Sequence, residues 1–149
     1  MPQEFLGNWR PYSSDTYDHL VIDADSVRVE DKIKGHYTWL RAWQYKIIAI
    51  EGNKVLLVTK EQVSEAWKKL INPGGRFGPW YPYVLLIREQ DPDRPSYYFL
   101  IFQEFDSDGI EDEKTSQKNF TDPSSINQEH LQIIRRDRLY SDTTYIRND

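Results

Sequence analysis

The sequence predicts an all-β protein, namely an antiparallel up-and-down β-barrel of about eight strands with one short mid-chain helix. Short β-rich runs recur along the chain and are separated by polar turns. One run carries four aromatic rings on alternate positions, interrupted by one Arg, and a period of two is that of an extended strand. A chain of 149 residues fits one domain with a single core, so residues 1–149 are expected to form one unit.

Strands are expected through most of the first half. Residues 19–23 and 27–30 flank a short polar turn and predict a hairpin. Residues 37–50 form the long strand with the aromatic alternation. Residues 51–54 then form a turn, and residues 55–59 return alongside.

The middle of the chain carries the predicted helix. Residues 61–70 place apolar side chains at helical spacing, and the Pro and Gly of residues 72–75 end that pattern. Residues 83–87 and 97–102 are apolar on both faces, so both strands are expected to be covered on both sides. Residues 90–96 contain two prolines and predict a turn.

The last third is mostly polar. Residues 106–127 have few apolar side chains and predict a long solvated loop, the least ordered internal segment. Residues 130–134 are expected to form a strand, and residues 143–147 a final one.

The long strand also carries the main candidate binding residues. Its odd positions hold Tyr37, Trp39, Trp43 and Tyr45, which are expected to share a face that points into the barrel. These rings either line a ligand pocket or fill the barrel as core. Arg41 lies on the same face between the two Trp residues. An inward Arg needs a partner, either an anionic group of a ligand or a carboxylate of the protein.

A second aromatic group lies in residues 74–83. Phe77, Trp80 and Tyr83 follow two glycines and are interrupted by prolines. Residues 74–82 are expected to form either a lid over the mouth of the barrel or a structured connection that packs on the core.

Composition excludes some functions and disfavours others. The chain has no Cys, which excludes disulfides and zinc–thiolate sites, and its formal net charge of −5 disfavours nucleic acid as a partner. No transmembrane segment and no signal peptide are recognisable, so the chain as given predicts a cytoplasmic protein, or an exported one if a signal was removed.

Neither a metal site nor a catalytic motif is recognisable. The histidines His19, His36 and His130 lack the spacing of a metal motif, and the acidic run 104–109 lacks the final carboxylate of a calcium loop. No nucleophile elbow or zinc-protease motif is present, so no catalytic residue and no cofactor are predicted.

The opening Phe5-Leu-Gly-Asn-Trp9 resembles the Gly-x-Trp entry of the lipocalins and other calycins, and the closing Thr144-Tyr-Ile-Arg147 looks like that of small bacterial lipocalin-like domains. The resemblance implies a barrel with a cavity for a small, largely apolar molecule. It also implies that Trp9 plugs one end of the barrel, that Gly7 lets the chain pass close by, and that Arg147 lies across the Trp9 ring. The chain departs from the lipocalins in the mid-chain position of its predicted helix.

Three functions follow from these observations. The preferred hypothesis is a non-enzymatic barrel that binds a small, largely apolar or aromatic ligand. The alternative is an interaction protein with a filled barrel, whose exposed rings bind another protein or a second copy in a homodimer. The third is an enzyme that uses a carboxylate in the barrel mouth.

Overall fold

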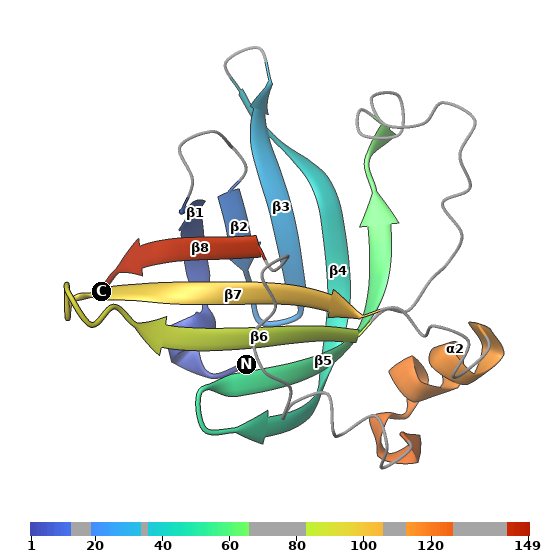
Figure 1. The fold of residues 1–149 in the computed structure, drawn as a ribbon. Coiled ribbons are helices and arrows are strands. Elements are labelled where there is room, and N and C mark those ends of the chain that lie inside the picture. Colours follow the sequence, from blue (N-terminus) through green and yellow to red (C-terminus); the bar gives the residue numbers. More distant parts are fainter. Residues whose placement is uncertain (13–18, 34–35, 66–82, 106–112, 127–142) are drawn as a thin grey trace.

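The computed structural model, which describes residues 1–12, 19–33, 36–65, 83–105, 113–126 and 143–149, is a closed antiparallel barrel (Figure 1). Its strands follow chain order, and the last pairs with the first. The strands are β1 (Gly7–Pro11), β2 (His19–Ile22), β3 (Ser26–Ile33), β4 (His36–Glu51), β5 (Lys54–Val63), β6 (Tyr83–Gln90), β7 (Tyr97–Phe105) and β8 (Thr143–Asn148). The predicted fold class is therefore confirmed.

The barrel interior is one apolar layer to which every strand contributes. On β6, Val84 and Leu86 point into this layer while Leu85 and Ile87 point outward, as the alternation of a strand requires. The largest interior side chains are Phe5, Trp9, Trp43, Tyr45, Phe102 and Tyr145. These six aromatic side chains thus supply much of the volume of the described interior.

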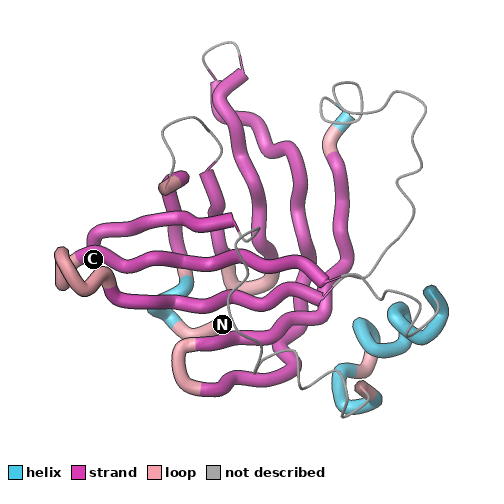
Figure 2. The backbone as a smooth tube through the Cα atoms, in the orientation of Figure 1, coloured by secondary structure: helices cyan, strands magenta, loops and turns pink. Residues whose placement is uncertain are grey.

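A second apolar layer covers the outer face of β5, β6 and β7. The helix α2 (Glu113–Thr121) and the short 3₁₀ helix η2 (Pro123–Ser125) pack there through Phe120 and Ile126. Figure 2 shows both helices outside the strands. This arrangement explains why β6 and β7 are apolar on both faces.

Two predictions about helices need correction. Residues 61–63 belong to β5 rather than to the predicted helix, Glu65 within the predicted range is helical, and residues 66–70 lie outside the described part of the chain. The helix α2 lies within residues 106–127, where a loop was expected. Among its described side chains, Phe120 is the one that packs in the outer apolar layer, and Asn119 donates a hydrogen bond to the Tyr83 hydroxyl of β6. The strand predicted for residues 130–134 lies outside the described residues.

The long strand β4 contains two irregularities that change which side chains point inward. Consecutive residues Val29 and Glu30 of β3 face Arg41 and Trp39 of β4, so Leu40 is an extra residue. A second shift occurs between Ile47 and Ala49. Because a bulge reverses the alternation beyond it, the odd positions of β4 do not all share one face.

Candidate functional site

The two ends of the barrel are built differently. At one end, called here the Trp9 end, the 3₁₀ helix η1 (Gln3–Phe5) contributes the buried ring of Phe5 to the interior. Trp9 is fully buried, and its indole Nε1 donates a hydrogen bond to the carbonyl oxygen of Phe5 at 2.9 Å. The indole therefore has both apolar neighbours and a polar partner.

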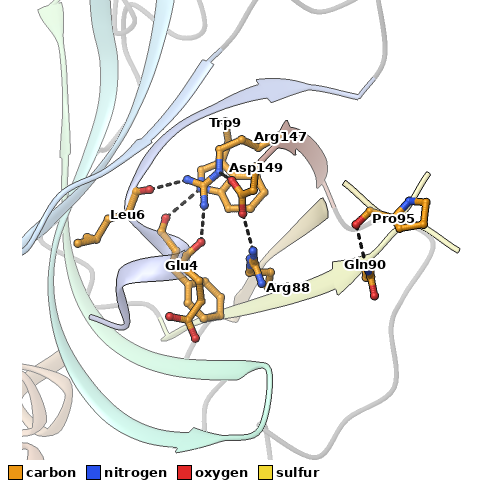
Figure 3. A network of polar contacts seen from close by, with 9 residues as sticks. Glu4, Leu6, Trp9, Arg88, Gln90, Pro95, Arg147 and Asp149 are labelled. Atoms are coloured by element: carbon orange, nitrogen blue, oxygen red, sulfur yellow. Dashed lines mark hydrogen bonds and ion pairs between the residues drawn. The ribbon is translucent and has the colours of Figure 1, made fainter. Parts of the chain in front are cut away.

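Arg147 lies over the Trp9 ring, with its Cζ atom 4.0 Å from the ring centroid (Figure 3). Its guanidinium donates to the backbone carbonyls of Leu6 and Glu4, both at 2.5 Å. Its Nε donates to the carboxylate of Asp149 at 2.7 Å, and the same carboxylate accepts from Arg88. The Trp9 end thus ties the last strand to the first residues of the chain.

Gly7 has a φ of +108°, which other residues rarely adopt. A Cβ atom at this position would come within 3.3 Å of Nη1 of Arg147. Both the backbone conformation and the position of Arg147 therefore require glycine here.

The opposite end, called here the Arg41 end, carries a cluster of three charged side chains from three strands. Nε of Arg41 on β4 donates to Glu61 on β5 at 2.7 Å. Nη2 of Arg41 donates to Glu104 on β7 at 2.8 Å. The Cζ atom of Arg41 lies 4.6 Å from the centroid of the Trp43 ring. The guanidinium is therefore held between two carboxylates and against an indole.

Sheet register brings these residues together. Trp43 pairs with Glu61 across β4 and β5, and Arg41 pairs with Val63 two positions further along. The barrel wall then continues through β6 to Glu104 on β7. The ends of these strands adjoin the segments 66–82 and 106–112, which are not described.

The electrostatics of the cluster are dominated by the two carboxylates. Burial by itself lowers the pKa of Arg41, but the hydrogen bonds and charges of Glu61 and Glu104 outweigh it and raise that pKa above its usual value. Arg41 therefore stays cationic, and it forms ion pairs with both carboxylates. The sequence left open whether an anionic ligand or a protein carboxylate would pair with Arg41, and the structure supplies carboxylates.

Below the cluster, the Trp43 ring is buried, with 1% of its surface exposed. It packs against Phe102 with the ring centroids 5.1 Å apart. Its indole Nε1 is also buried and has no hydrogen-bond partner among the described residues. The Trp9 indole N–H thus donates a hydrogen bond, whereas the Trp43 indole N–H has no acceptor among the described residues.

Tyr45 lies in the same interior layer as Trp43. Its hydroxyl donates to the carbonyl oxygen of Asp23 at 2.6 Å. Burial, together with the charges of Asp25 and Asp23, raises the pKa of Tyr45 to about 12. The hydroxyl is therefore a neutral donor with its partner already in place.

Of the other residues predicted for the ligand site, the two whose side chains are described are separated from this group. Trp39 was expected inside, but it is 39% exposed, because the extra residue Leu40 turns it to the outer face. Tyr83 belongs to the outer apolar layer, where its hydroxyl accepts a hydrogen bond from Asn119 at 3.0 Å. The side chain of Tyr37 and the residues Phe77 and Trp80 lie outside the described part of the structure.

Sequence reasoning missed the partners of Arg41. Glu61 was assigned to the predicted helix, and Glu104 was considered only as part of an acidic run. The available signal was the alternation on β7, where Leu100, Phe102 and Glu104 share a face.

No cluster of His, Asp or Glu that could hold a metal ion occurs among the residues that the structure describes. The described helices include none that is both long and apolar enough to cross a membrane. Comparison of the chain with protein-family models, with curated proteins and with solved structures gives no match.

Proposed function

We propose that the barrel binds a small, largely apolar or aromatic molecule at the Arg41 end, without catalysing a reaction. The observation that carries the proposal is the indole Nε1 of Trp43, which is buried but lacks an acceptor among the described residues. More than about 90% of buried polar groups in proteins have a partner, and leaving one without a partner costs about 1–3 kcal/mol. A ligand with an acceptor atom would satisfy this group.

The surroundings of Trp43 suit such a ligand. Phe102 and Tyr45 supply apolar ring surface, while the charged cluster above supplies a polar rim. A small number of polar groups among many apolar ones is typical of small-molecule sites. The contrast with Trp9 supports the same conclusion, because the Trp9 indole donates to Phe5 while the Trp43 indole has no acceptor among the described residues.

A lipocalin-like relationship is part of this proposal. It is supported by a closed eight-stranded barrel in chain order and by the contact of Arg147 with Trp9. The packing of α2 beside β5–β7 differs from a helix that follows the last barrel strand, and it makes the proposed relationship a distant one.

The proposal is tested by isothermal titration with 2-(1-naphthyloxy)ethanol, which joins an aromatic body to an ether and a hydroxyl acceptor. Wild type and Trp43→Phe are compared with Trp39→Phe, which makes the same chemical change on the outer face. We expect one molecule to bind per chain, with Trp43→Phe weakening binding by about threefold to tenfold, as for one lost hydrogen bond. Absence of binding to the wild type, or an equal loss in both variants, contradicts the proposal.

A further inference from the structure

We infer that the outer face of β1, β8 and β7 is a self-association surface, to which a second copy of this chain binds about a two-fold axis. This inference does not depend on the proposed ligand. It follows from a row of four side chains that crosses β1, β8, β7 and β6. The row has a cation at one end, an anion at the other, and apolar side chains between them.

Sheet register places the four side chains of this row next to one another. Arg10 is opposite Ile146 across β1 and β8. Ile146 is opposite Phe99 on β7, which in turn is opposite Glu89 on β6. Opposite residues of an antiparallel pair share a face, and the next residues along β1, β8 and β7 belong to the interior layer. These interior neighbours are Trp9, Tyr145 and Leu100. The whole row therefore points outward.

The two charged ends of the row lack an ion-pair partner. Arg10 is exposed and Glu89 is half-buried, and neither forms an ion pair with a residue that the structure describes. The Cζ atom of Arg10 lies 5.9 Å from the centroid of the Tyr97 ring. Arg94, which lies over the same ring, differs because its Nε donates to Asp91 at 2.9 Å. Arg10 and Glu89 can therefore pair with charges of another molecule.

Aromatic rings form the middle of this face. Tyr12, which follows β1, is 58% exposed. Its ring meets that of Phe99 edge to face, with the centroids 5.3 Å apart. The helix α2 lies well away from β8 (Figure 1). Exposed rings beside charged side chains are typical of protein–protein interfaces, in which aromatic residues and Arg are enriched.

The order of charges along the row favours a second copy as the partner. A two-fold axis that is perpendicular to the sheet and passes between Ile146 and Phe99 reverses the row. Arg10 of each copy then meets Glu89 of the other, and the apolar side chains meet across the axis. A single-stranded nucleic acid could stack on the same rings, but Glu89 and the net charge of −5 of the chain would repel it.

Charge reversal tests this arrangement, with sedimentation velocity at low salt from about 1 to about 200 µM protein as the measurement. The wild type is expected to dimerise. Arg10→Glu and Glu89→Arg, each made alone, place like charges opposite each other twice per dimer, so each is expected to weaken association by about tenfold or more. The double variant is expected to restore association. An equimolar mixture of the two single variants is expected to restore it too, because one copy then carries both acidic residues and the other both basic ones.

Two further variants complete the experiment. Lys114→Glu on α2 is the matched control, because it changes the net charge as much as Arg10→Glu at an exposed position outside this face. It is expected to leave the dissociation constant of the dimer unchanged. Phe99→Ala removes a ring next to the axis and is expected to weaken association by about tenfold. If Phe99→Ala does not fold, as judged by circular dichroism, Tyr12→Ala takes its place.

Three results would overturn the inference. The first is a wild type that stays monomeric over the whole concentration range. A monomer that binds a labelled single-stranded oligothymidine, and loses this binding in Arg10→Glu, would assign the face to nucleic acid instead. The second is a dimer that neither charge reversal weakens, or that Lys114→Glu weakens equally, because its interface would lie elsewhere. The third is restoration by the double variant but not by the mixture, which would indicate that Arg10 and Glu89 act within one chain.

Discussion

Arg147 on the last strand lies over Trp9 on the first strand, with its Cζ atom 4.0 Å from the ring centroid. The same guanidinium binds the backbone carbonyls of Glu4 and Leu6. One side chain therefore links η1, β1 and β8 where the barrel closes. The pairing between β1 and β8 is short, with Arg10 opposite Ile146 and Pro11 opposite Tyr145. Few backbone pairs therefore reinforce the contacts of Arg147 at this closure.

Truncation of the Trp9 ring is expected to destabilise the protein more than replacement of Arg147 by another cation. Trp9→Ala should lower the free energy of unfolding by about 3–5 kcal/mol, because it leaves a large cavity in the interior layer. Arg147→Lys should cost about 0.5–2 kcal/mol, because an ammonium keeps the charge but cannot lie flat on the indole. Urea denaturation measures both. An Arg147→Lys variant as stable as the wild type would show that the contact contributes nothing.

Glycine at position 7 is expected to be required more strongly than glycine at position 52. Both have positive φ, but an added Cβ would meet Arg147 at position 7 and nothing within 4 Å at position 52. Gly52→Ala should cost about 1 kcal/mol for the backbone conformation alone. Gly7→Ala should cost about 2–3 kcal/mol. If thermal denaturation showed the same loss of stability for Gly7→Ala and Gly52→Ala, this would argue against a close approach of Arg147 to position 7.

Asp149 is expected to stabilise the fold at neutral pH and to lose this effect in acid. Burial by itself raises the pKa of its carboxyl, but the hydrogen bonds and charges of Arg88 and Arg147 outweigh it and lower that pKa below the usual value. A carboxyl whose pKa is lower in the folded state stabilises the fold above its unfolded value of about 3.9. The stabilisation is lost as the pH falls through the folded pKa.

The matching measurement compares wild type with Asp149→Asn between pH 7 and pH 2. At neutral pH the variant should be less stable by up to about 1 kcal/mol, as for a partly exposed ion pair. The difference should close as the carboxyl becomes protonated. A difference that stayed constant across the range would show that the charge of Asp149 is not responsible.

Tyr45 is expected to make the protein sensitive to alkali. Its pKa is raised to about 12 in the folded state, against about 10 in an unfolded chain. The stabilisation is therefore complete below pH 10 and is lost as the pH rises toward 12. Tyr45→Phe should remove this part of the pH dependence in denaturant titrations at pH 8–11. Parallel pH profiles for the two proteins would contradict the assignment.

The fold could be predicted because its signals are local. Alternation within single strands and short turns such as residues 51–54 indicated a barrel without any knowledge of partners. Helix positions were predicted less well. The apolar pattern of residues 61–63 is compatible with both a helix and a strand, and these residues form a strand because they pair with β4. The helix α2 depends on contacts of Asn119 and Phe120 with a surface supplied by strands distant in the sequence.

The candidate site could be predicted only in part. Arg41, Trp43 and Tyr45 were identified from the sequence, and the structure places all three on β4, with both rings in the interior layer. Trp39 was misplaced because a bulge at Leu40 has no reliable sequence signal. The carboxylates that bind Arg41 come from other strands, and a register between strands cannot be read from one sequence.

The central claim is that the indole N–H of Trp43 donates a hydrogen bond to a bound ligand. Nuclear magnetic resonance tests this claim most directly. Indole N–H signals of ¹⁵N-labelled protein are recorded during addition of 2-(1-naphthyloxy)ethanol, with Trp43→Phe and Trp39→Phe used for assignment. The account predicts that the Trp43 signal moves downfield on binding, as expected for a new hydrogen bond, while the Trp9 signal, already bonded to Phe5, stays in place. A Trp43 signal that does not move while the probe binds elsewhere would contradict it.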